Sequence, residues 1–262
     1  MRLRSWAAFA AGVVVAGVVV AQPPKLEPIK PAAGSSIAEV PKSADPLSDM
    51  LGEARTAYSK MRDYSGTYTR QERLNGSLSA QQVGEMKMRV NPVGVYVRFA
   101  MPDLVSGMEV AYSGAKRNAK VRYRQAGAAG RKGVLRLEVD DAKFLADNRH
   151  PVTEWGMGPI LELIATSTAR EKTLNNPVET FTSDYQFTNR NVTKYEILMR
   201  RPHALRYAAR MVVFIDKETK LPIRYEAYDE PKAGALVGDV TEVYSFTDMK
   251  YNTGLGENVF DF

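Results

Sequence analysis

The chain of 262 residues contains no cysteine. Disulfide bonds therefore cannot stabilise the fold, which must bury enough apolar surface through chain length alone. No cysteine follows the apolar N-terminal run either, so a processed chain cannot carry acyl groups on its own first residue. Any lipid associated with the protein must be a bound ligand.

Residues and motifs typical of catalysis and cofactor binding are also scarce. The chain has two histidines, and neither a Gly-x-Ser-x-Gly elbow nor a Walker loop occurs. The segments "GMGPIL" and "GLGENV" lack the third glycine of a dinucleotide-binding turn. Without cysteine, a zinc site would depend on carboxylates, and Asp140, Asp141 and Asp147 lack the spacing of a calcium loop. We therefore expect no cofactor, no metal site and no catalytic residue.

The excess of positive charge is small. The formal net charge is +6 at pH 7, and the basic residues are spread along many segments. Lys120, Arg122 and Arg124 alternate with Val121 and Tyr123, as on the polar face of a strand. This distribution argues against nucleic-acid binding, and it is compatible with attraction to anionic lipid headgroups or envelope polymers.

The N-terminus has the layout of a secretory signal peptide. Basic residues in 1–4 precede an apolar run from Trp6 to Val20, and small residues follow. We predict a signal peptide over residues 1–21, cleaved after Ala21, and an exported protein of the periplasm or cell envelope. An uncleaved N-terminal anchor is the alternative, although the run is shorter than the roughly 18 residues of a confident membrane span.

A proline-rich segment follows, and it predicts a flexible tether over residues 22–44. Residues 45–262 show no second linker and no repeat, so we expect one domain there. Asp45-Pro46 predicts a helix start, and apolar residues then recur at helical spacing: Leu47, Met50, Leu51, Ala54, Tyr58 and Met61. A second helix is predicted after "NRHPVTEWG", with Pro159 in its first turn, and Thr166 to Thr168 are expected to weaken it.

The rest of the domain has the alternating pattern of strands. Asn75-Gly76 predicts a turn between 64–74 and 83–90, and Gly127 to Gly133 predicts a flexible reversal. Further strands are predicted at 95–99, 108–112, 118–124, 134–139, 181–187, 194–200, 210–216, 221–228 and 240–251. The fold class is therefore α+β and mainly β, with about 10 to 11 antiparallel strands and two helices.

Several segments together resemble a known family. They are "GTYTRQERLNG", "MKMRVNPVGVYVRF", "GMEVAYSG", "NRHPVTEWGMGPILELI", "LPIRYEAYD" and "YSFTDMKYNTGLGENVFDF". The chain resembles a family of exported bacterial proteins defined by a domain of unknown function, which is similar to the outer-membrane lipoprotein carrier (LolA/LolB/LppX-like) superfamily. This resemblance implies a half-open β-barrel closed by helices around a hydrophobic cavity, and it leaves the cargo open.

A barrel wider than about eight strands is not filled by its own side chains. We therefore expect a hydrophobic ligand, such as a lipid or a lipoprotein acyl chain, beneath the two helices. The candidate cavity and lid residues are Met86, Met88, Val97, Phe99, Trp155, Ile160 and Ile164. The protein would act as a carrier or a sensor, with peripheral or transient membrane contact.

Two other interpretations remain open. The domain could be a structural or regulatory module that binds an envelope protein and no ligand. It could also be a hydrolase that uses His150 and Glu154 within "NRHPVTEWG". Pro151 and Gly156 oppose a regular helix there, so the competing interpretation is a polar corner with Trp155 packed under the second helix. His203 lies in a basic loop and is expected to be structural.

Overall fold

The computed structural model describes residues 30–31 and 45–262. The predicted signal peptide over residues 1–21 lies outside the described residues, and so does the predicted tether over residues 22–44 except for Lys30–Pro31, which form a short strand on the sheet. None of the helices in the described part of the chain has the length and apolar content that crossing a membrane requires.

One antiparallel sheet of 13 strands forms the body of the domain. Its strands are β1 (Lys30–Pro31), β2 (Asp63–Leu74), β3 (Ser77–Leu78), β4 (Gln82–Arg89), β5 (Gly94–Met101), β6 (Glu109–Ser113), β7 (Val121–Arg124), β8 (Leu135–Leu137), β9 (Val178–Phe187), β10 (Arg190–Met199), β11 (Arg210–Asp216), β12 (Pro222–Tyr228) and β13 (Val240–Tyr251). Their order across the sheet is β1-β9-β10-β11-β12-β13-β2-β4-β5-β6-β7-β8, with β3 paired to β2. Because β1 and β8 do not pair with each other, the barrel is open on one side.

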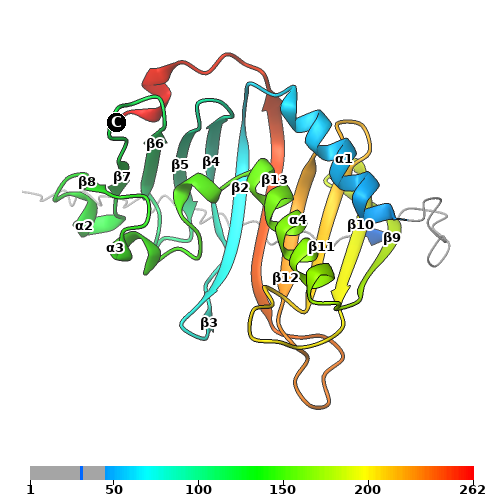
Figure 1. Cartoon of the computed structure of the whole chain (residues 1–262). Helices are drawn as coiled ribbons and strands as arrows, with labels where there is room; N and C mark the ends of the chain where they lie inside the picture. The colour runs from blue at the N-terminus through cyan, green and yellow to red at the C-terminus, as the bar shows by residue number, and fades with distance from the viewer. Residues whose placement is uncertain (1–29, 32–44) are drawn as a thin grey trace, which may run out of the picture.

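The sheet curves around two long helices that lie on its concave face (Figure 1). These helices are α1 (Pro46–Ser59) and α4 (Met157–Thr173). Four shorter elements complete the fold: α2 (Gly127–Gly130), α3 (Ala142–Leu145), η1 (Val152–Glu154) and η2 (Glu257–Phe260). The predicted half-open barrel with two helices is confirmed. The strand count is higher than predicted because β1 and β3 have two residues each, and a helical turn, α2, forms where a flexible reversal was expected.

The central hairpin follows from its turn residues. Asn75 and Gly76 both have positive φ, at 50° and 81°, as a type I′ turn requires. At this turn the end of β2 pairs with the short β3, and residues 63–70 of β2 pair with β4. The predicted hairpin is confirmed.

The first helix begins where its cap predicts. The Asp45 side chain accepts a hydrogen bond from the Ser48 amide at 3.0 Å, and Pro46 occupies the first helical position. Leu47, Met50, Leu51 and Ala54 are buried against the sheet. The helical stripe seen in the sequence is therefore the face that covers the core.

The second helix runs further than predicted. Thr166 and Thr168 remain helical, and their hydroxyls are satisfied within the helix by donating to the carbonyls of Glu162 and Ile164, each at 2.8 Å. The helix continues to Thr173, where Arg170 and Lys172 lie in the last turn and favour its negative end. It thus crosses more of the concave face than its apolar residues alone indicate.

A backbone conformation available to glycine fixes the start of α4. Gly156 has φ 104° and ψ −176°, a region that residues with a Cβ avoid. A Cβ atom there would lie 2.4 Å from the hydroxyl of Tyr64, which accepts a hydrogen bond from the Met157 amide at 3.0 Å. The chain can therefore turn from η1 into α4 only with glycine at this position.

We predict that Gly156→Ala lowers the free energy of unfolding by about 1 to 3 kcal/mol, because the backbone becomes strained and Tyr64 must move. Gly52→Ala is the matched control, since nothing lies within 4 Å of a Cβ at this helical position. It should raise the free energy by about 0.5 to 1 kcal/mol. Urea denaturation followed by circular dichroism measures both. Equal effects of the two substitutions would contradict the role assigned to Gly156.

Candidate functional site

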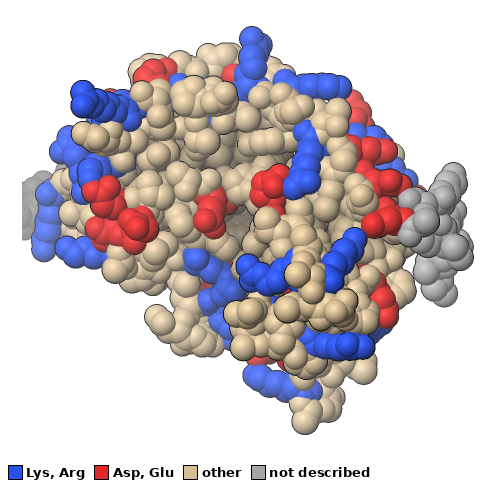
Figure 2. Space-filling view, viewed as in Figure 1, with Lys and Arg blue, Asp and Glu red and all other residues tan. Residues whose placement is uncertain are grey.

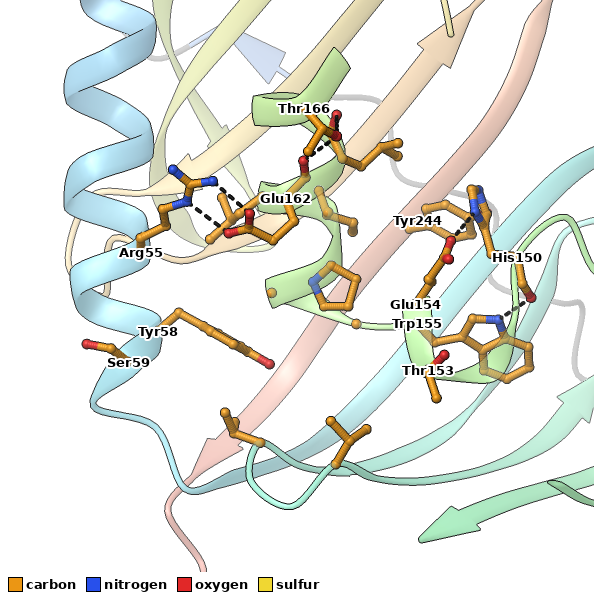
Figure 3. A pocket seen from close by; sticks show the side chains of 18 of the residues that line it. Arg55, Tyr58, Ser59, His150, Thr153, Glu154, Trp155, Glu162, Thr166 and Tyr244 are labelled. Atoms are coloured by element: carbon orange, nitrogen blue, oxygen red, sulfur yellow. Dashed lines mark hydrogen bonds and ion pairs between the residues drawn. The ribbon is translucent and has the colours of Figure 1, made fainter. Parts of the chain in front are cut away.

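A cleft of about 820 Å³ opens beside the two long helices. It lies at the surface as a hollow near the centre of the face shown in Figure 2, and Figure 3 shows its walls. The lining residues come from α1, the β4–β5 loop, the corner around η1, the first half of α4 and the sheet: Arg55, Tyr58, Ser59, Tyr68, Val90, Val93, His150, Thr153, Glu154, Trp155, Gly156, Gly158, Pro159, Ile160, Leu161, Glu162, Leu163, Thr166 and Tyr244. Most of this lining is apolar.

The α1 side of the cleft is held against α4 by one ion pair and one close contact. Arg55 donates from Nε and Nη2 to the two carboxylate oxygens of Glu162, at 2.9 and 2.7 Å. A Cβ atom on Gly158 would lie 2.4 Å from the ring of Tyr58, so the glycine lets this ring approach α4. The ion pair is largely exposed and contributes little stability, as exposed pairs generally do.

Trp155 forms the opposite wall and is fixed by its surroundings. Its indole nitrogen donates to the carbonyl of His150 at 3.2 Å, and its ring stacks on Phe144 with centroids 5.8 Å apart. The guanidinium of Arg70 lies 4.8 Å from the Trp155 ring centroid and 4.7 Å from that of Phe99. A wall held this way keeps its shape without a ligand.

The residues predicted to line a cavity fall into two groups. Trp155 and Ile160 line the cleft. Five others are packed in the main hydrophobic core, which fills the space directly beneath the helices: Met86, Met88, Val97, Phe99 and Ile164. The side chains of α1 and α4 occupy this space, so the open volume lies beside the helices. For the five core residues, contact with a ligand stays a prediction.

A buried polar network lies at one end of the cleft. Glu72 of β2 and Glu242 of β13 face each other directly across the two strands, and Glu242 has no exposed surface. The cation nearest to Glu72 is Arg70 of β2, at 4.0 Å. The corner segment supplies the countercharge of Glu242, since Arg149 Nε lies 3.1 Å from a Glu242 oxygen, and the Arg149 amide donates to Glu72 at 3.1 Å. His150 Nε2 lies 2.8 Å from Glu242. The corner therefore docks on the sheet through charge neutralisation.

Tyrosines complete the network. The Tyr207 hydroxyl donates to Glu242, and the Tyr244 hydroxyl donates to Glu72 at 2.6 Å. Tyr244 also lines the cleft and stacks between Tyr225 and Tyr68, with centroid separations of 6.3 and 6.2 Å. The aromatic floor of the cleft and the paired carboxylates are thus parts of one assembly.

The network shifts the pKa of its two central groups in opposite directions. Burial disfavours a charged imidazole, but the hydrogen bond and the attraction to Glu242 outweigh it, so the pKa of His150 lies above its ordinary value of 6.5. Burial also disfavours a charged carboxylate at Glu242. The hydrogen bond and charge of His150, followed by Tyr207 and Arg149, outweigh this effect, so the pKa of Glu242 lies below 4.5.

The network engages both nitrogens of the His150 ring. Nδ1 lies 3.2 Å from Glu154 and Nε2 lies 2.8 Å from Glu242, so each nitrogen faces a carboxylate of the protein itself. A general base must instead present a free nitrogen to the group it deprotonates. The geometry places His150 and Glu154 together as the hydrolase interpretation required, but it uses them to hold the corner.

The corner has the form expected of a polar turn. Residues 152–154 form a short 3-10 turn after Pro151, and Trp155 is buried behind it. His203 is also part of a structural contact, because its Nε2 lies 2.8 Å from the buried carboxylate of Glu171. Within the described residues, no three histidine, aspartate or glutamate side chains lie close enough to hold a metal ion.

Sequence reasoning missed the acidic half of the network. Glu242, Tyr244 and Phe246 alternate along β13, and they pair with Glu72, Arg70 and Tyr68 of β2. Since side chains of one strand alternate between the two faces of a sheet, the inward position of an aromatic predicts that the glutamate two residues before it also points inward. The alternation along β13 could therefore have predicted a buried carboxylate facing the corner segment "NRH".

The raised pKa of His150 gives a signed pH dependence. The stabilising pairing with Glu242 should be fully present below pH 6.5, the ordinary value, and be lost as pH rises through the higher pKa of the folded state. The lowered pKa of Glu242 gives the opposite pH dependence. The charged carboxylate stabilises the fold above pH 4.5, and this stabilisation is lost as pH falls through the lower pKa of the folded state.

We predict that His150→Gln removes the alkaline decline in the free energy of unfolding, measured by urea denaturation between about pH 5 and 9. Glu154→Gln is the control, because it removes the exposed partner of His150 and leaves the buried pair intact. It should keep most of the decline. A wild-type profile without the decline, or one that His150→Gln leaves unchanged, would contradict the proposed pairing.

Comparison with solved structures finds distant likenesses. LppX from Mycobacterium tuberculosis is 11% identical, with a TM-score of 0.47 and coverage of 82% of this chain and 99% of that one. A conserved protein from Thermus thermophilus is 11% identical, with a TM-score of 0.46 and coverage of 82% and 92%. A LolA superfamily protein from Nitrosomonas europaea is 9% identical, with a TM-score of 0.32 and coverage of 82% and 97%.

A search of curated proteins finds no match. The family model described as "Protein of unknown function (DUF1571)" matches residues 61–262, which include all of the sheet except β1, the whole of α4 and the buried network. The chain therefore belongs to the DUF1571 family.

Proposed function

We propose that the protein binds an amphiphile with a long apolar part, such as a lipid or an acyl chain, in the cleft between α1, α4 and the corner, and that it carries or senses this molecule in the cell envelope. The observation behind the proposal is the cleft itself. Its volume of about 820 Å³ is within the range of ligand pockets, and its lining is mainly apolar with few polar groups.

The walls of the cleft suit an acyl chain. Val90 and Val93 lie on one side, and Ile160 and Leu163 lie on the other. Burying an acyl chain releases roughly 0.8 kcal/mol per methylene before ordering costs, so a chain of about 16 carbons needs no specific polar contact to bind. Polar groups stand at the edges, where Glu154 and Glu162 are largely exposed. A headgroup would remain near these edges and the solvent.

Binding rather than catalysis is also favoured by the lining residues. The cleft holds the structural pairs of His150 with Glu154 and of Arg55 with Glu162, in which each charged group already has a partner. An exported location is part of the proposal and depends on the sequence of residues 1–21. The alternative, a module that binds an envelope protein without a ligand, would be favoured by a purified chain that lacks any bound amphiphile.

We predict that the chain purified under native conditions carries an amphiphile detectable by mass spectrometry, and that adding palmitate changes its tryptophan fluorescence. Trp155 is one of two tryptophans in the chain, and it lines the cleft. Val93→Glu should weaken palmitate binding by about tenfold or more, because ligand burial would desolvate the new carboxylate. Val93 is partly exposed, so the substitution should leave the fold intact.

Leu174→Glu provides the matched control, because Leu174 is exposed at the end of α4 and does not line the cleft. It should leave palmitate affinity unchanged. If Val93→Glu and Leu174→Glu bind palmitate as the wild type does, the cleft is not the binding site. If no amphiphile copurifies and none changes the fluorescence, the proposed function is wrong.

A further inference from the structure

Large exposed apolar side chains gather at one edge of the sheet. Because neighbouring strands are antiparallel, β2, β5, β10 and β12 all end at the edge where β4, β6, β11 and β13 begin. We call this edge, at the bottom of Figure 1, the lower rim. Its connections and the end of α4 carry most of the large apolar side chains that are exposed in the described residues: Leu78, Leu104, Leu174, Leu205, Leu236 and Val237.

Two loops of the lower rim are the most prominent. The β10–β11 loop, residues 200–209, exposes 65% of Leu205, and the β12–β13 loop, residues 229–239, exposes 99% of Leu236. Val237 beside it is also exposed. A leucine that is almost fully exposed gains from any apolar surroundings it can reach.

The bases of these two loops are anchored, and they are anchored to each other. Arg206 forms an ion pair with Glu230, which joins one loop to the other. Arg170 donates to the Leu205 carbonyl at 3.0 Å, and the Asp229 amide donates to the Asp239 carbonyl at 2.9 Å. The apolar side chains therefore project from fixed loops, and they are presented together on one side of the molecule.

The charges around them favour an anionic surface. The β10–β11 loop, "RRPHALRYAA", has three arginines and no acidic residue. Arg201 and Arg200 are exposed, the latter beside Glu179, whereas the Arg206 side chain is buried in its pair with Glu230. The tip of the other loop, "PKAGALVG", has one lysine and no acidic residue, and the acids at the loop's base include Glu230 and Asp239, which pair with Arg206 and Lys232. Cations beside exposed leucines match the polar and apolar layers of an anionic membrane surface.

We propose that the lower rim docks on an anionic lipid bilayer, with Leu205, Leu236 and Val237 inserted among the lipids and the exposed Arg200 and Arg201 at the headgroups. A fluid bilayer accepts side chains that stand on separate loops, whereas a protein partner must match their arrangement. The proposal does not depend on the ligand of the cleft, because the residues of the lower rim do not line it.

Single cysteines test the proposal cleanly, because the chain has none of its own. Leu205→Cys and Leu236→Cys, labelled with an environment-sensitive fluorophore in the full chain, should shift their emission to the blue when phosphatidylcholine vesicles containing phosphatidylglycerol are added. Glu218→Cys is the control, since Glu218 is exposed in the β11–β12 turn, at the edge of the sheet opposite the lower rim. Its emission should not change. These labels report the environment of their own position, whatever other segment of the chain contacts the vesicle.

No blue shift at positions 205 and 236, or an equal shift at position 218, would overturn the proposal. An equal response to vesicles of pure phosphatidylcholine would overturn the role of the arginines. In the chain labelled at position 205, Leu236→Glu with Val237→Glu should raise the vesicle concentration needed for half of the shift by about tenfold. Val93→Glu in the same labelled chain should leave it unchanged, because Val93 lies in the β4–β5 loop at the opposite edge of the sheet.

Discussion

Two glutamates face each other on neighbouring strands in the concave face of the sheet, and the arrangement of the site depends on how their charges are neutralised. Glu72 and Glu242 are a cross-strand pair of β2 and β13, and both are buried. Two negative charges on directly opposite residues of neighbouring strands would destabilise the sheet without a cation nearby. Arg70 of β2 lies 4.0 Å from Glu72, and Arg149 and His150 of the corner neutralise Glu242. The docked corner therefore stabilises the sheet.

The position of the corner then determines the position of the cleft. Trp155 and Gly156 follow directly after the residues that neutralise the glutamates, and α4 begins at Met157. The corner therefore sets both one wall of the cleft and the point where the second helix starts. The hydrogen bond from the Met157 amide to the Tyr64 hydroxyl ties this start to β2 as well. A polar contact at the sheet thus controls the shape of an apolar cleft several residues away.

Much of the fold could be predicted because local chemistry decides it. The cap at Asp45, the Asn75-Gly76 turn and the alternating strands predicted the first helix, the central hairpin and an antiparallel sheet, and the family resemblance implied its half-open barrel form. The end of α4 could not be predicted from propensity, because the hydroxyls of Thr166 and Thr168 bond back to the helix. Rules based on neighbouring residues predicted those elements whose structure depends mainly on their own segment of the chain.

The site was harder to predict because its parts are far apart in the sequence. His150 was recognised, but its carboxylate partner Glu242 lies 92 positions away and is marked only by the alternation along β13. Bulky inward residues such as Met86 and Phe99 suggested a cavity, whereas the volume left by α1 and α4 decides where open space remains. The open volume depends on how α1, α4 and the sheet pack together, so no single segment of the sequence predicts it.

The contact between α1 and α4 has a mechanical consequence for the domain. The two helices meet at the Tyr58 ring, at the solvent-exposed pair of Arg55 and Glu162, and where Lys172 of α4 pairs with Asp45, the N-cap of α1. Neither helix shares a backbone ladder with the strands. The strands form one continuous hydrogen-bonded sheet, whereas the two helices lie on its concave face without pairing to it. A tilt of one helix away from the other would therefore widen the cleft between α1 and α4 without breaking any strand pairing.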